Sequence, residues 1–505
     1  MKLKIRIAGA VAIALASTSL LGVTTAEAAA PTLTVGALQD VTNWDPSQAH
    51  LGHQVPMYQT VYDTLFIKDA KGLIQPNLAK KWYFDSAKLH LSIQLEKGIK
   101  FTNGEVLDAK AVAANIMANR NSNGQDASQL ADVASVSVSS PTNLVINFSS
   151  ANPAILSYLS GSSGFIGAPS LLGKMQTSPV GSGPYVFNAS KSSKGSKYVF
   201  DANPNYWNKR NQKFSTVTWL VMADTTARLN ALLSGQIDAT LLDVKTTAAA
   251  KAAGAILHES FVDVSNLQLF DRGGTKVKAL GDYRVRQAMN YAIDKAAILK
   301  AVNNNVGAVT DQMFGTSTDG YDPKFENYYS YNPAKAKELL AAAGYANGFE
   351  LPMPDISFAN SALQAFIVKY LGDVGITVKP VSVAPATFVS EIKSGKHAAT
   401  WFQLFQGTDW EEIKLIATQD ATWNVLKYND PQIAALVKKI QSNPLSIKTN
   451  AKKINQILVE KAWFVPLYRL SQQFFTNKKV DVDPTPAQAV PSLFNYSPAG
   501  NQEKK

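Results

Sequence analysis

The sequence contains no cysteine and only five histidines in 505 residues. The absence of cysteine excludes a disulfide framework, a thiolate nucleophile, an iron–sulfur cluster and any cysteine-based zinc site. Five histidines leave little material for an imidazole metal cage, so we predict no metal and no cofactor. His50 and His53 could meet on a turn, but no third ligand lies near them and we expect them to be structural.

Catalytic signatures are also missing. The phosphate-binding pattern G-x-x-x-x-G-K-[ST], the zinc pattern H-E-x-x-H and the nucleophile pattern G-x-S-x-G do not occur. The chain is therefore predicted not to be an enzyme, with a secreted hydrolase kept as the alternative from a different functional class.

Charge and length narrow the class further. The formal net charge is +11, but the lysines are spread along the chain without a block of five or six like charges. Nucleic-acid binding usually requires a concentrated basic stripe, so we expect no nucleic-acid partner. A chain of 505 residues exceeds what one hydrophobic core supports, which predicts two or three lobes.

The N-terminus has the pattern of an export signal. A cationic start (Lys2, Lys4 and Arg6) precedes an apolar stretch over residues 7–23, and Ala26-Glu27-Ala28 offers a small-x-small cleavage site. We predict that residues 1–28 are a cleaved signal peptide. The alternative is an uncleaved anchor helix, which the polar residues 17–19 disfavour. Since no cysteine is available for lipidation, the mature protein is predicted to be extracytoplasmic, most simply periplasmic, and not lipid-anchored.

The rest of the chain alternates strand and helix patterns. Residues 89–95 alternate apolar and polar side chains, as does the hairpin pattern over residues 133–148. Asp108, Asp224 and Asp282 each precede an apolar periodic run as helix N-caps would. These patterns predict a mixed α/β fold with at least two sheets.

An ordered series of motifs then resembles the dipeptide/oligopeptide-type extracellular solute-binding proteins, family 5, of ABC importers. The motifs, from about residue 44 to residue 468, include Val61–Phe66 (VYDTLF), Gln75–Trp82 (QPNLAKKW), Leu95–Gly104 (LEKGIKFTNG), Pro179–Tyr185 (PVGSGPY), Asn203–Trp207 (NPNYW), Leu233–Asp238 (LSGQID), Asp282–Ala288 (DYRVRQA) and Tyr331–Leu340 (YNPAKAKELL). Most of these residues have structural roles. We expect Gly181 and Gly183 to shape a chain reversal, and Arg284 and Arg286 to tie the lobes together.

The resemblance implies a periplasmic-binding-protein-like α/β fold, with two α/β lobes, a hinge and a smaller inserted β-rich subdomain. The implied boundaries are 29–62 and 179–262 for lobe I, 63–178 for the inserted subdomain, 263–470 for lobe II and 471–505 for the return to lobe I. The implied function is capture of a small solute, with short peptides the expected class, by a monomer that delivers it to an ABC permease. Nickel chelates (through His50 or His53), sugars and opines remain alternatives on the same fold, as does a chaperone or signalling receptor.

The resemblance also suggests ligand-binding residues. In peptide-binding relatives a late aromatic segment pairs with the peptide, and an aspartate there holds the ammonium group. The corresponding stretch here is 400–410, in which Asp409 is the predicted ammonium anchor or, alternatively, a helix N-cap. The other predicted ligand-binding residues are Trp44, which could equally be a core residue, and Trp401, Gln403, Phe405, Gln406 and Trp410. Strand alternation places Trp401, Gln403 and Phe405 on one face. Trp423 is a weaker candidate, and no carboxylate-binding arginine stands out.

Overall fold

A mixed sheet connects the two lobes of the protein, as described by a computed structural model for residues 30–50, 52–484 and 488–500. Within these residues nine strands form the sheet, eight of them in the order β10-β11-β12-β1-β13-β19-β14-β18, with β15 paired to β19. The described residues from Pro31 onward form one compact unit. The predicted export signal, residues 1–28, lies outside the described residues. The predicted α/β class with two lobes, a hinge and an inserted β-rich subdomain is confirmed.

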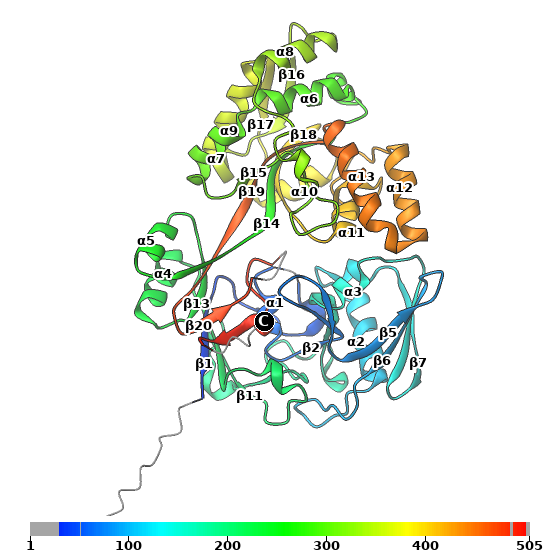
Figure 1. The fold of residues 1–505 in the computed structure, drawn as a ribbon, viewed down its shortest axis with the longest axis vertical. Coiled ribbons are helices and arrows are strands. Elements are labelled where there is room, and N and C mark those ends of the chain that lie inside the picture. The colour runs from blue at the N-terminus through cyan, green and yellow to red at the C-terminus, as the bar shows by residue number, and fades with distance from the viewer. Residues whose placement is uncertain (1–29, 51, 485–487, 501–505) are drawn as a thin grey trace, which may run out of the picture. The chain divides into compact units, whose positions relative to one another are not determined.

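Two long strands pass from the first lobe to the second. β14 (Ile256–Leu269) and β19 (Phe464–Thr476) pair antiparallel along most of their length, and Figure 1 shows them side by side between the lobes. The register shifts between Phe261 and Asp263 and again between Ser265 and Asn266. Such bulges bend a strand locally, and here they lie where the chain leaves one lobe for the other.

The first lobe is built on three parallel strands. β1 (Thr32–Ala37) lies between β12 (Thr216–Val221) and β13 (Ala239–Leu242). The remaining elements of this lobe are β10 (Tyr185–Phe187), β11 (Lys197–Ala202), α1 (Val55–Tyr58), α4 (Thr225–Ser234), α5 (Thr247–Ala252), β20 (Val480–Val482) and β21 (Tyr496–Pro498). The predicted cap of α4 is confirmed, because the Asp224 carboxylate accepts the backbone N–H of Ala227 at 2.7 Å.

The inserted subdomain is a four-stranded antiparallel sheet covered by one helix. Its elements are β2 (Asp63–Thr64), β3 (Phe66–Lys68), β4 (Ile74–Pro76), β5 (Ala79–Phe84), β6 (His90–Leu95), α2 (Ala109–Arg120), β7 (Val133–Ser140), β8 (Asn143–Phe148), α3 (Ile155–Tyr158) and β9 (Phe165–Ile166). The predicted hairpin is β7–β8. The Asp108 carboxylate accepts the N–H groups of Lys110 and Ala111, which confirms it as the cap of α2.

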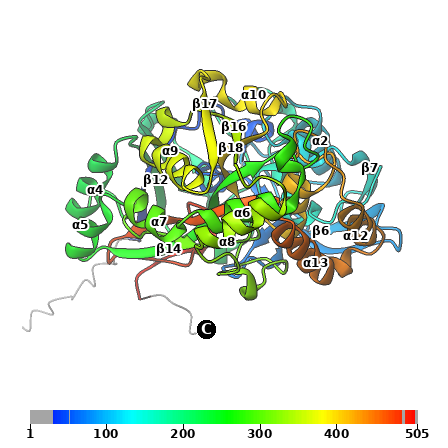
Figure 2. The ribbon, with the colours of Figure 1, turned by 90° about the horizontal axis from the view of Figure 1, so that it is seen from above.

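Helices dominate the second lobe. Its elements are α6 (Tyr283–Ala292), α7 (Lys295–Asn303), β15 (Ala308–Val309), α8 (Pro333–Ala342), β16 (Phe349–Pro354), α9 (Ser357–Gly372), β17 (Ile376–Val381), α10 (Phe388–Lys393), β18 (Ala399–Phe405), α11 (Asp409–Glu412), α12 (Pro431–Ser442) and α13 (Ile447–Glu460). Viewed from above in Figure 2, α12 and α13 lie side by side at one edge, and their apolar faces join the second-lobe core.

The expectation that Arg284 and Arg286 tie the lobes together is wrong. Arg286 is buried and donates to the carbonyl oxygens of Leu280, Lys461 and Ala462, all within the second lobe. Arg284 pairs with Asp282 at the start of the same helix. Both side chains lie in the first turn of α6 and bond to groups of the second lobe, so they stabilise that lobe and do not connect it to the first.

The joint between the first lobe and the inserted subdomain is instead centred on Asp63. This fully buried carboxylate accepts hydrogen bonds from Ser182 Oγ (2.9 Å), Trp207 Nε1 (3.0 Å) and Tyr206 Oη (3.0 Å). Asn77 Nδ2 approaches it at 3.5 Å. Four of the sequence motifs therefore converge on one carboxyl group, which explains why they occur together.

Glycine is required beside this joint because the backbones approach closely. The N–H of Gly183 donates to the carbonyl oxygen of Val61 at 2.8 Å. A Cβ atom on Gly181 would lie 2.1 Å from that same oxygen. The expected chain reversal at these glycines therefore packs against the backbone of Val61, two residues before Asp63.

Candidate functional site: a recess between the lobes

The second-lobe side of the site is built on β18 and on its partner strand β14. The antiparallel register places Phe405 opposite Asp263 and Gln403 opposite Ser265. Residues directly opposite each other in such a pair point to the same side of the sheet. Asp263 therefore shares a face with Phe405, whose ring lines a recess between the lobes.

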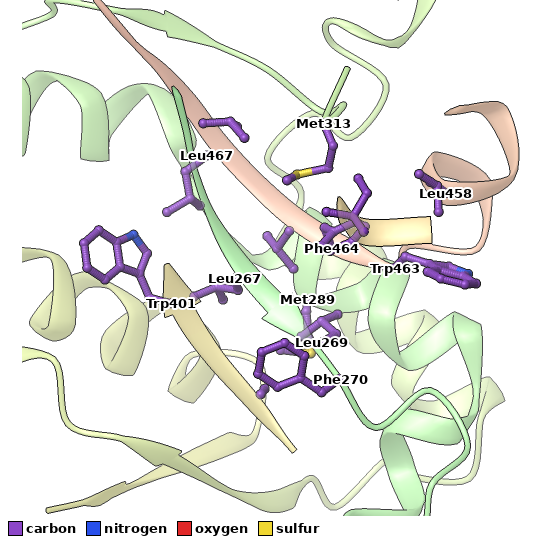
Figure 3. Packing of buried hydrophobic residues seen from close by; sticks show 14 of the residues in the cluster. Leu267, Leu269, Phe270, Met289, Met313, Trp401, Leu458, Trp463, Phe464 and Leu467 are labelled. Carbon is purple, nitrogen blue, oxygen red and sulfur yellow. The ribbon is translucent and has the colours of Figure 1, made fainter. Parts of the chain in front are cut away.

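The predicted aromatic stretch is divided between core and surface. Trp401 is buried in the second-lobe core, where its indole Nε1 donates to Ser265 Oγ at 2.8 Å. Figure 3 shows Trp401 beside Leu267, its partner across the two strands. Gln403 is exposed, and Phe405 is half-buried. Their contact with a solute stays a prediction.

The turn that follows β18 is fastened by its own side chains. Gln406 is buried; its backbone N–H donates to Val262 O at 2.7 Å, and its side-chain amide donates to Met313 O. Thr408 is the N-cap of α11 in a capping box, in which Thr408 N donates to Glu411 Oε2 at 2.6 Å. The alternative prediction that Asp409 caps this helix is therefore wrong, because Thr408 occupies the cap and Asp409 is the first helical residue.

Asp409 holds a neighbouring loop. Its carboxylate accepts the backbone N–H groups of Gly320 at 2.7 Å and Asp319 at 3.1 Å. Burial raises the pKa of Asp409 to about 6, although these two backbone donors act in the opposite direction. Trp410 beside it is buried in the second-lobe core. The predicted roles of Asp409 as ammonium anchor and of Trp410 as pocket wall stay predictions.

The recess itself is lined from both sides. Ser157 Oγ, in the inserted subdomain, donates to Glu411 Oε1 at 3.4 Å, a contact between residues 254 positions apart. Glu411 is oriented by the capping box and by close packing on Gly407, where a Cβ atom would lie 2.6 Å from Glu411 Oε2. The lining residues are Lys68, Gln129, Ser157, Tyr158, Ser160, Gly161, Ser162, Phe405, Glu411 and Gln488. Glu411 thus presents one carboxylate oxygen to the recess.

Buried carboxyl groups make the second-lobe side acidic. Among the described residues Asp263 accepts one hydrogen bond, from Gln472 Nε2 at 3.2 Å, and burial raises its pKa to about 6. Glu412 is fully buried and accepts the N–H of Gly407 at 2.8 Å. Burial raises the pKa of Glu412 well above its usual value, and the neighbouring carboxylates add to that shift. A cation in this region would stabilise the ionised forms of these groups.

Trp44 lies elsewhere, in the first lobe. Its ring packs against Tyr58, Tyr198 and Phe200 at centroid distances of 5.3–5.6 Å, and it belongs to the first-lobe core. It also lines a second recess, formed by first-lobe residues and by residues 176–178 at the end of the implied inserted subdomain. Its packing is that of a core residue, and its contact with a solute stays a prediction.

His50 and His53 are the histidines that the nickel-chelate alternative would use. Burial lowers the pKa of His53, with the positive charge of Arg228 adding to the shift. Across the described ranges no group of three histidine, aspartate or glutamate side chains is placed to hold an ion. None of the helices in those ranges is both long and apolar enough to span a bilayer.

Three residues were not predicted from the sequence: Ser157 and Glu411, which line the recess, and Asp263, which lies on the same face as Phe405. Glu411 did carry a signal, because Thr408-x-x-Glu411 is a capping-box pattern that fixes the direction of its side chain. Ser157 and Asp263 carried none, because only long-range packing and strand register determine where they lie.

Two lobes joined by crossing strands, with a recess lined from both sides, define the periplasmic-binding-protein fold. The protein is similar to solved structures of this fold. HbpA2 from Haemophilus parasuis superposes with a TM-score of 0.81 at 21% identity, covering 92% of this chain and 99% of that one. The binding protein DppA from Helicobacter pylori, in complex with the peptide STSA, gives a TM-score of 0.73 at 20% identity, covering 92% and 98%.

The sequence comparisons define the family. The profile of the bacterial extracellular solute-binding proteins, family 5, middle region, matches residues 74–423, so the chain belongs to this family. The glutathione-binding protein GsiB of Pectobacterium atrosepticum is 26% identical over 461 residues, covering 82% of this chain and 84% of that one. GsiB of Escherichia coli K12 is 25% identical over 480 residues, covering 87% and 89%. The protein is thus a solute-binding component of an ABC importer, as its motifs predicted.

Proposed function

We propose that the protein captures a short peptide or a peptide-like solute with a free ammonium group and delivers it to a membrane permease. The observation that carries this proposal is the Glu411 carboxylate in the recess between the lobes, which Lys68 also lines. Glu411 offers it a carboxylate oxygen, and Asp263 lies on the same face as Phe405 in its lining. A charge-assisted hydrogen bond from an ammonium group to such a carboxylate is among the stronger polar contacts in proteins.

The relatives support the same solute class. The GsiB proteins are named for binding glutathione, a peptide-like molecule with a free ammonium group, and the DppA structure contains a tetrapeptide. The NikZ structure from Campylobacter jejuni, which holds nickel with histidine, represents the other solute class in this fold. The Glu411 carboxylate at the recess suits the ammonium group of a peptide, which is why we propose a peptide as the solute.

The remaining parts of the proposal follow from this role. Residues 1–28 act as a cleaved export signal, and the mature chain works outside the cytoplasm as a monomer without a lipid anchor. It performs no catalysis of its own. The ATPase of the importer supplies the energy for transport. The peptide is released to the permease when the lobes separate about β14 and β19.

Analysis of the co-purified solute tests the proposal. The chain is purified without refolding, denatured, and the released small molecules are identified by mass spectrometry. In parallel, glutathione, tri-alanine and nickel with histidine are titrated into ligand-free protein by calorimetry. Recovery or binding of a peptide supports the proposal, whereas binding of the nickel chelate alone, or recovery of a sugar, contradicts it.

A further inference from the structure

The second recess, in the first lobe, has the features of a binding site for a ring. Its cavity volume is about 210 Å³, and it lies between the loop that follows β1, the segment before Pro179 and the β10–β11 hairpin. The residues that matter here are Trp44, Ser178, Phe187, Ala189, Lys194 and Tyr198.

This recess lies at the carboxyl ends of the parallel strands. The N–H of Met222, just beyond β12, bonds to Ala37 O at the end of β1, and Val221 N bonds to Ser196 O in the hairpin. The same edge faces the second lobe, because β13 pairs with β19 so that Ala239 lies opposite Thr476. β19 runs from the second lobe into the first, and Leu242 at the end of β13 lies opposite Gln473, which precedes Thr476 in β19. The end of β13 is therefore nearer the second lobe than its start is. Open α/β sheets bind ligands at the carboxyl ends of their strands.

The walls of the recess are aromatic and held in place. The ring of Trp44 meets that of Tyr198 edge to face at 5.3 Å, and Phe187 packs 5.5 Å from Phe200. The Tyr198 hydroxyl donates to Asp40 Oδ1 at 2.7 Å, which fixes the ring that forms one wall. A cavity of about 150 Å³ lined by apolar side chains is known to be large enough for benzene, so this volume suits a phenyl or indole group.

We propose that the first-lobe recess receives an apolar, ring-bearing side chain of the captured solute. This inference rests on the proposed function, since the ring must belong to the molecule whose ammonium group the second lobe holds. It makes the protein selective for peptides with a phenylalanine or tryptophan side chain. Trp44, Phe187 and Tyr198 are then specificity-determining residues, and Lys194 at the rim favours a nearby carboxylate.

The test fills the recess instead of removing its core walls. Ala189→Trp places an indole in the cavity from an exposed position, and Ala341→Trp, at an exposed position of α8, is the matched control. Calorimetry compares Ala-Ala-Ala, Ala-Phe-Ala and Ala-Trp-Ala on the wild type and both variants. We expect the ring peptides to bind about tenfold more tightly than Ala-Ala-Ala, from burial of the ring.

The outcomes separate this inference from the proposed function. A189W should reduce the ring advantage to about twofold or less and leave Ala-Ala-Ala unaffected, while A341W behaves as the wild type. A ring preference that survives in A189W overturns the inference and leaves peptide capture intact.

A probe without a peptide backbone tests the recess in the case that no tripeptide binds. If no tripeptide binds at all, the proposed function fails, and fluorine NMR of 5-fluoroindole decides the recess alone. A resonance broadened by the wild type and by A341W but not by A189W supports a ring site. A resonance that the wild type leaves sharp contradicts it.

Discussion

Two carboxyl groups, Asp63 and Asp263, have similarly raised pKa values but different surroundings. Burial raises the pKa of each to about 6. Asp63 is met by hydrogen-bond donors from three other segments of the chain. Asp263, in contrast, accepts a single amide among the described residues and shares a face with the recess lining.

The number of hydrogen-bond donors around a carboxyl group indicates whether it can bind a ligand in this fold. A buried carboxylate surrounded by donors has no capacity left for a ligand, so Asp63 is structural. A carboxylate with spare acceptor capacity can bind an external cation. Within the described part of the chain Glu411 Oε1, at the recess, accepts only a hydrogen bond of 3.4 Å, and Asp263 lies on the same face as Phe405 in the recess lining. The motifs that identify the family surround the first kind of group and say little about the second.

The largest expected effect is on stability, at Asp63. Asp63→Asn puts an amide donor against groups that already donate, and we expect a loss of about 3 kcal/mol in the free energy of unfolding. Thermal unfolding followed by circular dichroism measures it. The control is Asp373→Asn in an exposed ion pair with Lys369, which should change stability by less than about 0.5 kcal/mol. An equal effect of the two substitutions would show that Asp63 is not the joint.

The next effect is on affinity, at the recess. Glu411→Gln keeps the capping box, since glutamine can replace glutamate there, but removes the charge offered to the ammonium group. We expect tri-alanine or glutathione to bind about 10- to 100-fold more weakly with little change in unfolding temperature. Calorimetry measures it, and Glu350→Gln on the exposed surface is the matched control. Unchanged affinity in E411Q would remove Glu411 from the site.

The two carboxyl groups also predict opposite pH trends for stability and binding. The folded pKa of Asp63 and Asp263, about 6, lies above the ordinary value of 3.8, so the folded state binds protons more tightly than the unfolded state. Stability should therefore decrease as pH rises from about 4 to about 6. Peptide affinity should increase over the same range, because only ionised Asp263 attracts the ammonium group.

Chemical denaturation and calorimetry at a series of pH values measure the two trends. Asp263→Asn should flatten the dependence of affinity on pH without removing the part of the stability trend that Asp63 contributes. A variant that binds as steeply with pH as the wild type would exclude Asp263 from recognition.

The smallest expected effect concerns the contact across the recess. Ser157→Ala removes a single hydrogen bond of 3.4 Å between the inserted subdomain and Glu411. We expect affinity to change by about twofold, because a long neutral-donor bond contributes about 0.5 kcal/mol. A loss as large as that in E411Q would mean that Ser157 itself binds the solute.

Much of the fold could be predicted from local sequence. Capping residues such as Asp108 and Asp224 act within one helical turn, so their patterns fixed where α2 and α4 begin. The lobes were implied by the resemblance of the motifs to a known family, and four of those motifs converge on Asp63. The wrong prediction that Arg284 and Arg286 connect the lobes has a different origin. The position of a residue in the first turn of a helix does not indicate which lobe its long side chain will contact.

The site was less predictable because its parts meet only in three dimensions. The alternation over 401–405 was readable, but the burial of Trp401 depends on Ser265 in a strand far away in sequence. Asp409 has the residue type expected of an anchor, yet its carboxylate is engaged by the backbone of residues 319–320. Residue type and spacing locate the segment, and the hydrogen-bond partners decide which carboxylate remains available.

A crystal structure of the protein with bound tri-alanine tests the central claim most directly. We predict that the peptide lies between the lobes with its ammonium nitrogen within hydrogen-bonding distance of Glu411 Oε1 or of the Asp263 carboxylate. A peptide bound on an outer surface, or one whose ammonium group contacts neither carboxylate, would contradict the account.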